Sequence, residues 1–503
     1  MKSFLVIILL AYLYCEAKFD TTKNNLLFDF SKGFKIPGVL SDNSTRLNNN
    51  VLFPKQIEEI KQQAAEHFWP HSAQAGDMSE SGVRIVNRGK GVWVEDAVGD
   101  QWFDLISSMY LVNIGHGRSE IAEAVYEQMK AISYSPGATV TPATSQLSAK
   151  VASLSPDKDS RVFFVSGGSE AVETAIKMAK QYHYNNGDAG RWKVLSRQGS
   201  YHGSTHMCMS LAQQGTNVAP FGPLVPGNIH IANHNSYRGI CNDGEGNCNL
   251  ECAKEVDRGI EHAGPGTVAA FIGEPVSAAS GTHIPHPDYW PMLREICDKH
   301  GVILICDEVI NGCGRTGKMF ATEHWGVQPD IFTVAKALTS GYLPVGAAIA
   351  SKKISDAFIG DEDKTFRHLI TFGGNPPTAA AGLANLKIME EEGMVENSAN
   401  MGDHLYQRLQ RLYEHSIVGD VRGGLGLMAE VELVKDRDTK APFSKDDKLG
   451  DKVAALFRDH NILGRLGRGG GIPIYPPLCV TKDEIDDLVD RLDSVLGKIQ
   501  SQI

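Results

Sequence analysis

The sequence lacks the features of several protein classes. Beyond its N-terminus, the 503-residue chain has no apolar run long enough to cross a bilayer. Positive charge is also scarce: 49 Lys and Arg stand against 60 Asp and Glu, which gives a net charge of −11. We therefore expect neither nucleic acid nor a membrane as the main partner. No internal repeat is apparent, so a repeat architecture is not expected either.

Cysteine is too rare for a disulfide-stabilised scaffold, with nine in a chain of this length. Cys306 and Cys313 fall in an apolar region and have the character of small core residues. Cys241, Cys248 and Cys252 cluster in a Gly- and Asn-rich stretch, where one disulfide or none can form. A zinc site is a weaker alternative, because no fourth ligand with standard spacing is apparent. We predict no metal site and leave the disulfide open.

The N-terminal segment has the composition of a cleaved secretory signal. Lys2 precedes an apolar run over residues 4–13, and the segment 1–17 ends at a small residue, Ala17. The apolar run is too short to span a bilayer, and the absence of arginine argues against a transit peptide. We expect cleavage after Ala17 and a secreted or lumenal protein of the secretory pathway.

Residues 18–60 form a second distinct segment, rich in Asn, Lys, Ser and Asp, with weak periodicity. Its composition is compatible with a propeptide, a flexible arm, or an arm packed on a partner subunit. Asn43 opens an Asn-Ser-Thr glycosylation acceptor, which fits an exposed segment that enters the secretory pathway.

The remaining chain is long enough for two domains of unequal size, given its 42% apolar content. We place the N-terminal part of a small domain at residues 61–105 and a large domain at 106–390. The C-terminal part of the small domain follows at 391–503. Its last helix is signalled by a capping box of Thr481 and Glu484.

Two apolar segments organise the large domain. Residues 302–306 end at Asp307, and residues 331–335 end at Lys336. Both are typical of parallel strands buried on two faces, and ligands bind outside the carboxyl ends of such strands. An amine beside a carboxylate suggests a pyridoxal phosphate site, with a Schiff-base lysine and an acid that keeps the pyridine nitrogen protonated. The alternative is that Asp307 is a helix cap and Lys336 a solvated loop charge.

A third strand is followed by a glycine-rich turn. Residues 161–165 lead directly into Gly168 and Ser169, and an amphipathic helix follows. Free N–H groups and the dipole at such a helix start favour an anion, so this joint is a candidate phosphate cradle. The glycines can equally serve the turn alone.

Two further strands complete the pattern. Residues 193–196 precede Tyr201, whose ring can either stack on a flat cofactor or belong to the core. The buried segment 267–273 ends at Glu274. Strands that alternate with helical segments predict an α/β fold with a doubly wound, mostly parallel sheet, plus a smaller α+β domain.

In this order the segments resemble the class III aminotransferases, a branch of the fold-type-I pyridoxal phosphate enzymes. The similarity runs from about residue 65 to the C-terminus. Each motif is weak alone, but together they are specific. The matching motifs are Gly168-Ser169-Glu170-Ala171, Tyr201-His202-Gly203, Gly273-Glu274-Pro275-Val276, Asp307-Glu308-Val309-Ile310, Gly314-Arg315-Thr316-Gly317, Ala335-Lys336-Ala337-Leu338 and Thr371-Phe372-Gly373-Gly374-Asn375-Pro376.

The resemblance implies a role for each matching position, with pyridoxal 5'-phosphate as cofactor. Lys336 and Asp307 would be catalytic, and Tyr110 and Arg465 would bind substrate. Thr371 would act in the site of the other subunit, which implies a homodimer or a dimer of dimers. The positions implied to hold the cofactor are Gly168, Ser169, Tyr201, His202, Glu274, Asp307, Val309, Lys336 and Thr371.

The resemblance implies ping-pong transfer of an amino group from an ω-amino acid, β-amino acid or amine to a keto acid such as pyruvate or glyoxylate. Ornithine- and GABA-type members carry glutamine at the position of Ile310 and glutamate at that of Ala279, so both departures resemble the branch that acts on ω-amino acids and amines. In that branch, phenylalanine is usual at the position of Cys313. The same lysine could also serve a racemase, mutase, decarboxylase or phospho-lyase. A catalytically silent secreted binding protein is a further alternative.

A pair of arginines near the C-terminus bears on the substrate. Family members place an arginine upstream of a Pro-Pro-Leu element, where it grips a carboxylate. Arg465 matches that position best and Arg468 is the second choice, while both could instead be solvated surface residues. In ornithine-type members, the glutamate at the position of Ala279 can neutralise this arginine when the bound substrate has no α-carboxylate. Ala279 carries no charge, so we expect the Arg465 side chain to swing into solvent when an amine without a carboxylate binds.

Overall fold

The computed structural model describes most of the chain after its N-terminal region. The chain separates into two compact units, residues 1–83 and 84–503, and each is described by itself. The predicted signal, its cleavage site and Asn43 lie outside the described residues. The described ranges are 52–72, 83–212, 218–242 and 248–502, with the backbone of 18–20 and 25–27.

In the first unit, β1 (Lys18–Asp20) pairs antiparallel with β2 (Asn25–Leu27), and α2 (Pro54–His67) follows. Pro54 occupies the first helical position, where its missing N–H costs nothing. Helix α2 crosses the boundary predicted between residues 60 and 61, and the domain limits stay a prediction.

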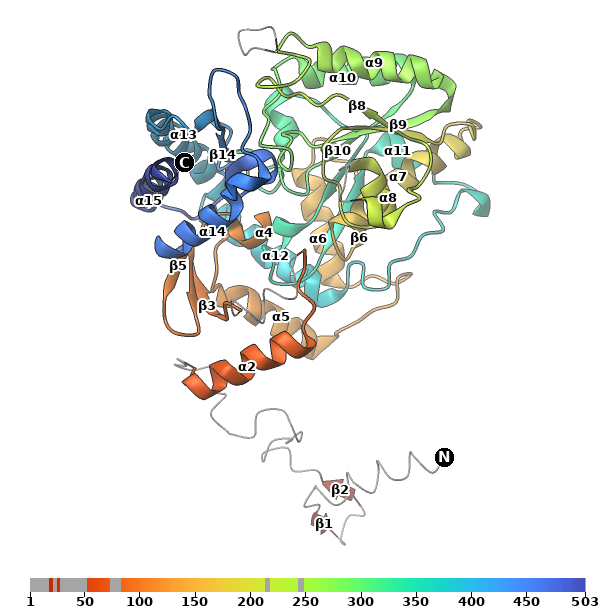
Figure 1. Cartoon of the computed structure of the whole chain (residues 1–503). Helices are drawn as coiled ribbons and strands as arrows, with labels where there is room; N and C mark the ends of the chain where they lie inside the picture. The colour runs from red at the N-terminus through yellow and green to blue at the C-terminus, as the bar shows by residue number, and fades with distance from the viewer. Residues whose placement is uncertain are drawn as a thin grey trace. The chain divides into compact units, whose positions relative to one another are not determined.

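The second unit is built around a seven-stranded sheet (Figure 1). Neighbouring strands run parallel, except that β12 (Gly346–Ala350) is antiparallel to the strands on both its sides. This confirms the expected α/β class with a mostly parallel sheet. In spatial order the strands are β6 (Arg161–Val165), β12 (Gly346–Ala350), β11 (Ile331–Val334), β10 (Ile303–Asp307), β9 (Val268–Gly273), β7 (Lys193–Arg197) and β8 (Asn228–Ile231).

The sheet is buried on both faces, which explains why its strands are apolar throughout. Successive side chains of a strand point to opposite faces. Ile303 and Ile305 accordingly join one hydrophobic cluster, whereas Leu304 and Cys306 join another. The first cluster includes apolar residues of α7 (Gly168–Asn185) and α8 (His206–Ala212). The second includes those of α9 (Glu251–Ala263), α10 (Tyr289–His300) and α12 (Pro376–Glu391).

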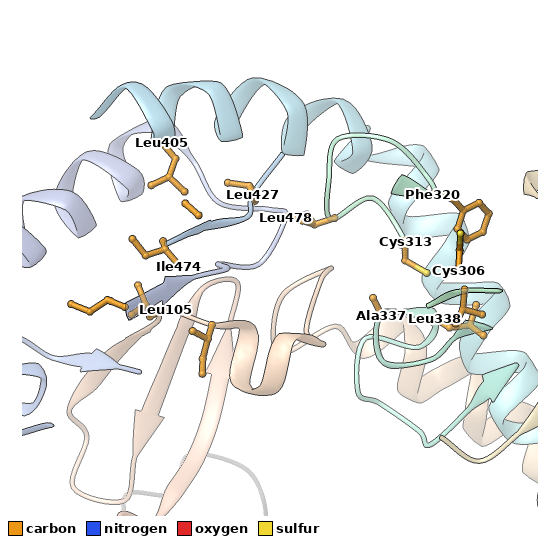
Figure 2. Close-up of a cluster of buried hydrophobic side chains, with 14 of the residues drawn as sticks. Leu105, Cys306, Cys313, Phe320, Ala337, Leu338, Leu405, Leu427, Ile474 and Leu478 are labelled. Carbon is orange, nitrogen blue, oxygen red and sulfur yellow. The ribbon is translucent and has the colours of Figure 1, made fainter. Parts of the chain in front are cut away.

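The second cluster continues from the sheet into the C-terminal segment. Figure 2 shows Cys306 and Phe320 at one end of this core and Leu427 and Ile474 at the other. Cys313 is buried within it, so both cysteines expected in the core are there. One continuous apolar core therefore joins the large sheet to the C-terminal elements.

Two smaller sheets complete the second unit, and they bring distant segments together. The three-stranded sheet contains β13 (Val418–Arg422), β14 (Ala429–Leu433) and β16 (Gly471–Ile474). In the other sheet, β4 (Trp93–Asp96) and β5 (Gln101–Asp104) form an antiparallel hairpin, and β15 (Ile462–Leu463) pairs parallel with β5. The strands of this four-stranded sheet are β15 (Ile462–Leu463), β5 (Gln101–Asp104), β4 (Trp93–Asp96) and β3 (Val86–Lys90).

The remaining helices pack around these sheets. The last helix, α15 (Lys482–Ser501), begins with the predicted capping box, in which Thr481 accepts from the Glu484 N–H. Within the described ranges, no helix combines the length and apolar character needed to pass through a bilayer. The others are α4 (Ser107–Tyr110), α5 (Ser119–Ala131), α6 (Pro142–Leu154), α11 (Lys352–Asp356), α13 (Met394–Leu409) and α14 (Leu449–Asp459).

Candidate active site

A cavity of about 420 Å³ lies at the carboxyl ends of the central strands. Asp307 is the last residue of β10, and Lys336 follows β11 after Ala335; both line this cavity. The two strands are adjacent and parallel, with Asp307 in register with Thr333. The sheet thus brings together the acid and the amine that the sequence analysis paired.

Lys336 is held in an unusual conformation and environment. Its φ of 43° lies in the left-handed region, which non-glycine residues rarely adopt. Loss of hydration lowers the pKa of its ammonium to about 8, although the carboxylates of Asp307 and Glu274 act to raise it. A sizeable fraction of the amine is therefore neutral near physiological pH, as a nucleophile requires.

Asp307 is buried and accepts several hydrogen bonds. His202 Nδ1 lies 2.7 Å from its Oδ2, and the Thr333 hydroxyl donates to its Oδ1 at 3.1 Å. The Val309 N–H also donates to Oδ1 at 3.1 Å. Because the chain turns after β10 without starting a helix at this point, Asp307 is no helix cap. The carboxylate is instead fixed at the wall of the cavity.

The glycine-rich turn and the start of α7 form a second wall of the cavity. The N–H groups of a first helical turn have no partner within the helix, so they are available to an anion. Ser169 Oγ accepts from the Ser204 N–H at 3.0 Å. A Cβ at Gly168 would lie 2.9 Å from Val309 Cγ1, so a larger residue here would force Val309 to move. The turn is therefore shaped to let backbone approach a ligand closely.

A third wall carries Tyr201, His202 and Glu274. Glu274 is buried, and its two oxygens accept from the N–H groups of Tyr201 at 2.8 Å and Ala278 at 2.7 Å. Its carboxylate thus ties the Tyr201 segment to the end of β9. The His202 Nε2 atom has no hydrogen-bond partner among the described residues, which leaves it available to a bound group.

Tyr110 and Arg465 lie together near the lysine. The Tyr110 ring centroid is 6.0 Å from Lys336 Nζ and 6.0 Å from Arg465 Cζ. Tyr110 packs edge-on against Tyr475, with ring centroids 4.8 Å apart. Arg465 is exposed and, within the described part of the chain, forms no ion pair with a carboxylate. Thr371 is exposed and does not line the cavity of its own chain.

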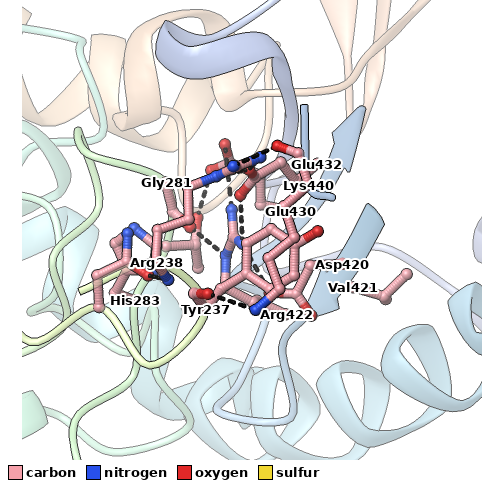
Figure 3. A network of polar contacts seen from close by, with 12 residues as sticks. Tyr237, Arg238, Gly281, His283, Asp420, Val421, Arg422, Glu430, Glu432 and Lys440 are labelled. Atoms are coloured by element: carbon pink, nitrogen blue, oxygen red, sulfur yellow. Dashed lines mark hydrogen bonds and ion pairs between the residues drawn. The ribbon is translucent and has the colours of Figure 1, made fainter. Parts of the chain in front are cut away.

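A buried polar network that was not predicted contains Arg422 and Glu430 (Figure 3). It extends through Thr282 to Tyr475. The Thr282 hydroxyl lies 2.7 Å from Tyr475 Oη and donates to Glu430 Oε2 at 2.9 Å. Burial raises the pKa of Glu430 to about 7, against the effect of nearby Arg422. Arg422 also pairs with Glu432 at 2.7 Å. Alternating Glu residues in β14 are typical of a solvent-facing strand, so the sequence carries little sign of this network.

Arg315, from the Gly314-Arg315-Thr316-Gly317 motif, has a structural role. It is fully buried, and burial lowers the pKa of its guanidinium to about 10. Its Nη1 donates to the carbonyls of Leu427 at 3.1 Å and Pro476 at 2.5 Å. Its Nη2 donates to Ser107 Oγ at 3.1 Å and Asn113 Oδ1 at 2.7 Å. Arg315 therefore joins three distant segments of the chain beside the cavity and does not line it.

Comparison with known proteins agrees with this arrangement. Residues 76–496 match the family described as Aminotransferase class-III. An uncharacterized aminotransferase, YhxA, of Bacillus subtilis is 39% identical over 86% of this chain and 96% of its own length. The taurine–pyruvate aminotransferase of Bilophila wadsworthia is 34% identical over 87% of this chain and 96% of its own. The crystal structure of an (S)-enantioselective omega-transaminase from Thermomicrobium roseum superposes with a TM-score of 0.84 at 38% identity, covering 88% and 98% of the two chains.

The chain belongs to the class III aminotransferase family. It is accordingly an enzyme, a pyridoxal-phosphate-dependent transaminase of fold type I. Such an enzyme moves an amino group from an amine or amino acid to a keto acid. The other chemistries that one lysine could serve are not favoured by these relatives.

The residues of the cavity fit the cofactor. The start of α7 offers N–H groups to a phosphate, and the partly neutral amine of Lys336 can form a Schiff base. Asp307 offers a buried carboxylate to a ring nitrogen, and the unpartnered His202 Nε2 lies on the same wall. The roles of these residues remain predictions that the experiments below test.

Proposed function

We propose that this transaminase takes its amino group from an ω-amino acid, a β-amino acid or an amine, and delivers it to pyruvate or glyoxylate. The observation that carries this proposal is Arg465, an exposed guanidinium at 6.0 Å from the Tyr110 ring. Its lack of a carboxylate partner among the described residues leaves it free to bind the carboxylate of a keto acid. The acceptor pyruvate in the name of the Bilophila wadsworthia relative supports the same choice.

Two residues of the chain would carry the chemistry. When bound, pyridoxal phosphate supplies an electron sink for the carbon that loses its proton. The neutral amine of Lys336 would take that proton and return it, because its lowered pKa of about 8 lets it act in both directions. Asp307, fixed by His202 and Thr333, would hold a proton on the ring nitrogen.

Isotope transfer tests this function. The enzyme would be supplied with a primary amine labelled at nitrogen and with pyruvate, and alanine would be analysed by mass spectrometry. We expect labelled alanine in amounts equal to the amine consumed. An enzyme that consumes the donor but forms no labelled alanine would contradict the proposed acceptor, and glyoxylate would then be tried in the same assay with glycine as the expected product.

We further propose a homodimer or a dimer of dimers in which Thr371 completes the partner's site. Three apolar side chains are exposed in the single chain: Tyr126 and Met129 in the second half of α5, and Ile132 directly after it. Phe372, next to Thr371, is also exposed and lies edge-on to Tyr134 at 6.3 Å. Exposed apolar groups of this kind mark interaction surfaces.

Light scattering during gel filtration tests the assembly. We expect the mass of two or four chains, and we expect Thr371→Ala to weaken cofactor retention without changing that mass. A mixture of Thr371→Ala and Lys336→Ala chains should regain activity if each site uses residues of both chains. A monomeric enzyme with full activity would contradict the proposal.

For localisation, we propose that residues 1–17 are removed and that the mature chain is secreted or lumenal. The apolar run over residues 4–13 behind Lys2 supports this. N-terminal sequencing of protein from the medium should begin at Lys18, and glycosidase treatment should lower the mass if Asn43 carries a glycan. An intact Met1 on a cytosolic protein would refute it.

A further inference from the structure

Three cysteine sulfurs meet in a region separate from the active-site cavity. The sulfurs of Cys241, Cys248 and Cys252 all lie within 4.8 Å of one another. Cys241 and Cys252 are buried, whereas Cys248 is partly exposed, and none of the three is in a disulfide. Because each of the three sulfurs is close to both others, the arrangement differs from one disulfide-bonded pair with a third cysteine lying apart.

Main-chain contacts, and no covalent bond, hold the first two cysteines together. Asn242 and Cys248 form an isolated antiparallel β-bridge. The Asn249 N–H donates to the carbonyl of Cys241 at 2.7 Å. The backbone therefore sets the approach of Cys241 to Cys248 before any sulfur chemistry takes place.

The third cysteine comes from the start of α9, where negative charge is favoured. Leu250 adopts a left-handed conformation with φ 64° and turns the chain into the helix, so Cys252 stands in its first turn. The Leu250 N–H donates to Cys248 Sγ at 3.4 Å. The dipole of α9 favours negative charge at this helix start, and so favours a thiolate at Cys252.

We propose that Cys241, Cys248 and Cys252 bind one zinc ion through their thiolates. Cys248 Sγ and Cys252 Sγ are 3.7 Å apart. Two sulfurs each about 2.3 Å from a tetrahedral zinc stand about 3.8 Å apart, whereas a disulfide needs about 2.05 Å. Thiolates are also the ligands that select zinc over the hard cations.

The fourth coordination position is open to water. Among the described residues, no further His, Cys, Asp or Glu brings a ligand atom within 4.8 Å of all three sulfurs. Cys241 and Cys252 belong to the same core as Tyr289 and Trp290 of α10. The ion would thus link Cys241 and Cys248 to the start of α9, away from the active-site cavity.

Metal analysis of the full-length, cofactor-loaded enzyme tests this site. After equilibration with zinc under reducing conditions and removal of the excess, we expect about one zinc ion per chain. Cys248→Ser and Cys252→Ser should each lower that content at least tenfold. Cys479→Ser is the matched control, because Cys479 is another partly exposed free cysteine, and it should keep full content.

A second measurement covers the case in which the serine variants fail to fold. Titrating the wild-type enzyme with a mercurial thiol reagent should release its zinc in proportion to the thiols modified, as followed by a chromogenic chelator. Cadmium should replace zinc and give the ultraviolet band of a cadmium–thiolate bond. Wild-type protein that takes up no zinc while all three thiols alkylate would overturn the proposal. A non-reduced chain lighter by two hydrogens, with two of these cysteines linked, would overturn it as well.

Discussion

The floor and the rim of the active-site cavity are built on different kinds of backbone. The floor residues, Asp307 and Lys336, stand at the carboxyl ends of neighbouring parallel strands buried on both faces. The arginines of what we call the rim, Arg465 and Arg468, do not line the cavity itself; they are exposed and stand in a glycine-rich segment between β15 and β16, with Arg465 beside Tyr110. A rigid floor suits chemistry that tolerates little displacement, whereas an exposed loop suits the selection of varied substrates. The two parts should therefore respond differently to mutation.

The largest effect is expected at the floor, from Lys336→Ala. This variant should lose transaminase activity, because among the described residues that line the cavity Lys336 is the one lysine able to form the Schiff base. Its fold should survive, since removing a poorly hydrated amine leaves no unpaired buried charge. Turnover and the absorption of lysine-bound cofactor measure the loss, and circular dichroism checks the fold. A lysine-dependent absorption that persists in this variant would show that another lysine binds the cofactor.

Asp307→Asn should give the next largest effect. The amide keeps the shape of the side chain but removes its charge, so turnover should fall on the order of 10² to 10⁴. Asp330→Asn is the control, because Asp330 is also buried and ion-paired, with Arg294 and Lys353, just before β11. That variant should lose stability but keep its turnover per folded molecule. Near wild-type turnover of Asp307→Asn would make this carboxylate structural only.

At the rim, Arg465→Ala should act on one half-reaction alone. A guanidinium–carboxylate pair contributes about 1.5–3 kcal/mol, so kcat/KM with pyruvate or glyoxylate should fall roughly 10- to 10²-fold. The half-reaction with a simple primary amine should change little, and Arg468→Ala should be nearly silent. Stopped-flow measurement of each half-reaction separates these outcomes. Equal losses in both would mean that Arg465 supports the fold, and the reverse ranking would move the role to Arg468.

The smallest effect is a shift in a pH profile. Lys336 has a folded-state pKa of about 8, below that of a free lysine, so attachment of cofactor to the cofactor-free enzyme should accelerate up to about pH 8. Since the unfolded chain holds this proton more tightly, the contribution of Lys336 to stability grows as pH rises above 8. Asp307 acts to raise the pKa of Lys336, so Asp307→Asn should move the profile to lower pH. A profile that does not move would show that the two groups are uncoupled.

The sequence predicted the positions of the floor residues far better than the arrangement of the strands and polar groups around them. Asp307 and Lys336 were placed correctly at strand ends because buried strands leave a strong local pattern, an apolar run followed by one charge. The reversed direction of β12 was not predicted, since the direction of a strand depends on its neighbours in the sheet. Nor was the burial of Glu430, whose partner Arg422 lies on a different strand.

The cysteine cluster shows the same limit of sequence reasoning. The spacing of Cys241, Cys248 and Cys252 left a disulfide or free thiols open and predicted no metal site. Only the β-bridge of Asn242 and Cys248 and the turn at Leu250 bring the three sulfurs together. These contacts depend on main-chain geometry that no residue type in the segment specifies.

The buried Arg315 has a consequence for how the chain folds during synthesis. Its guanidinium binds Ser107 and Asn113, which leave the ribosome before it, and Leu427 and Pro476, which leave long after it. Until Leu427 emerges the growing chain would have to bury a charge with two of its four acceptors missing, and until Pro476 emerges one is still missing, which is costly. Burial of Arg315 should therefore wait for nearly the whole chain, and nascent chains that stop short of Pro476 should remain sensitive to protease around this residue.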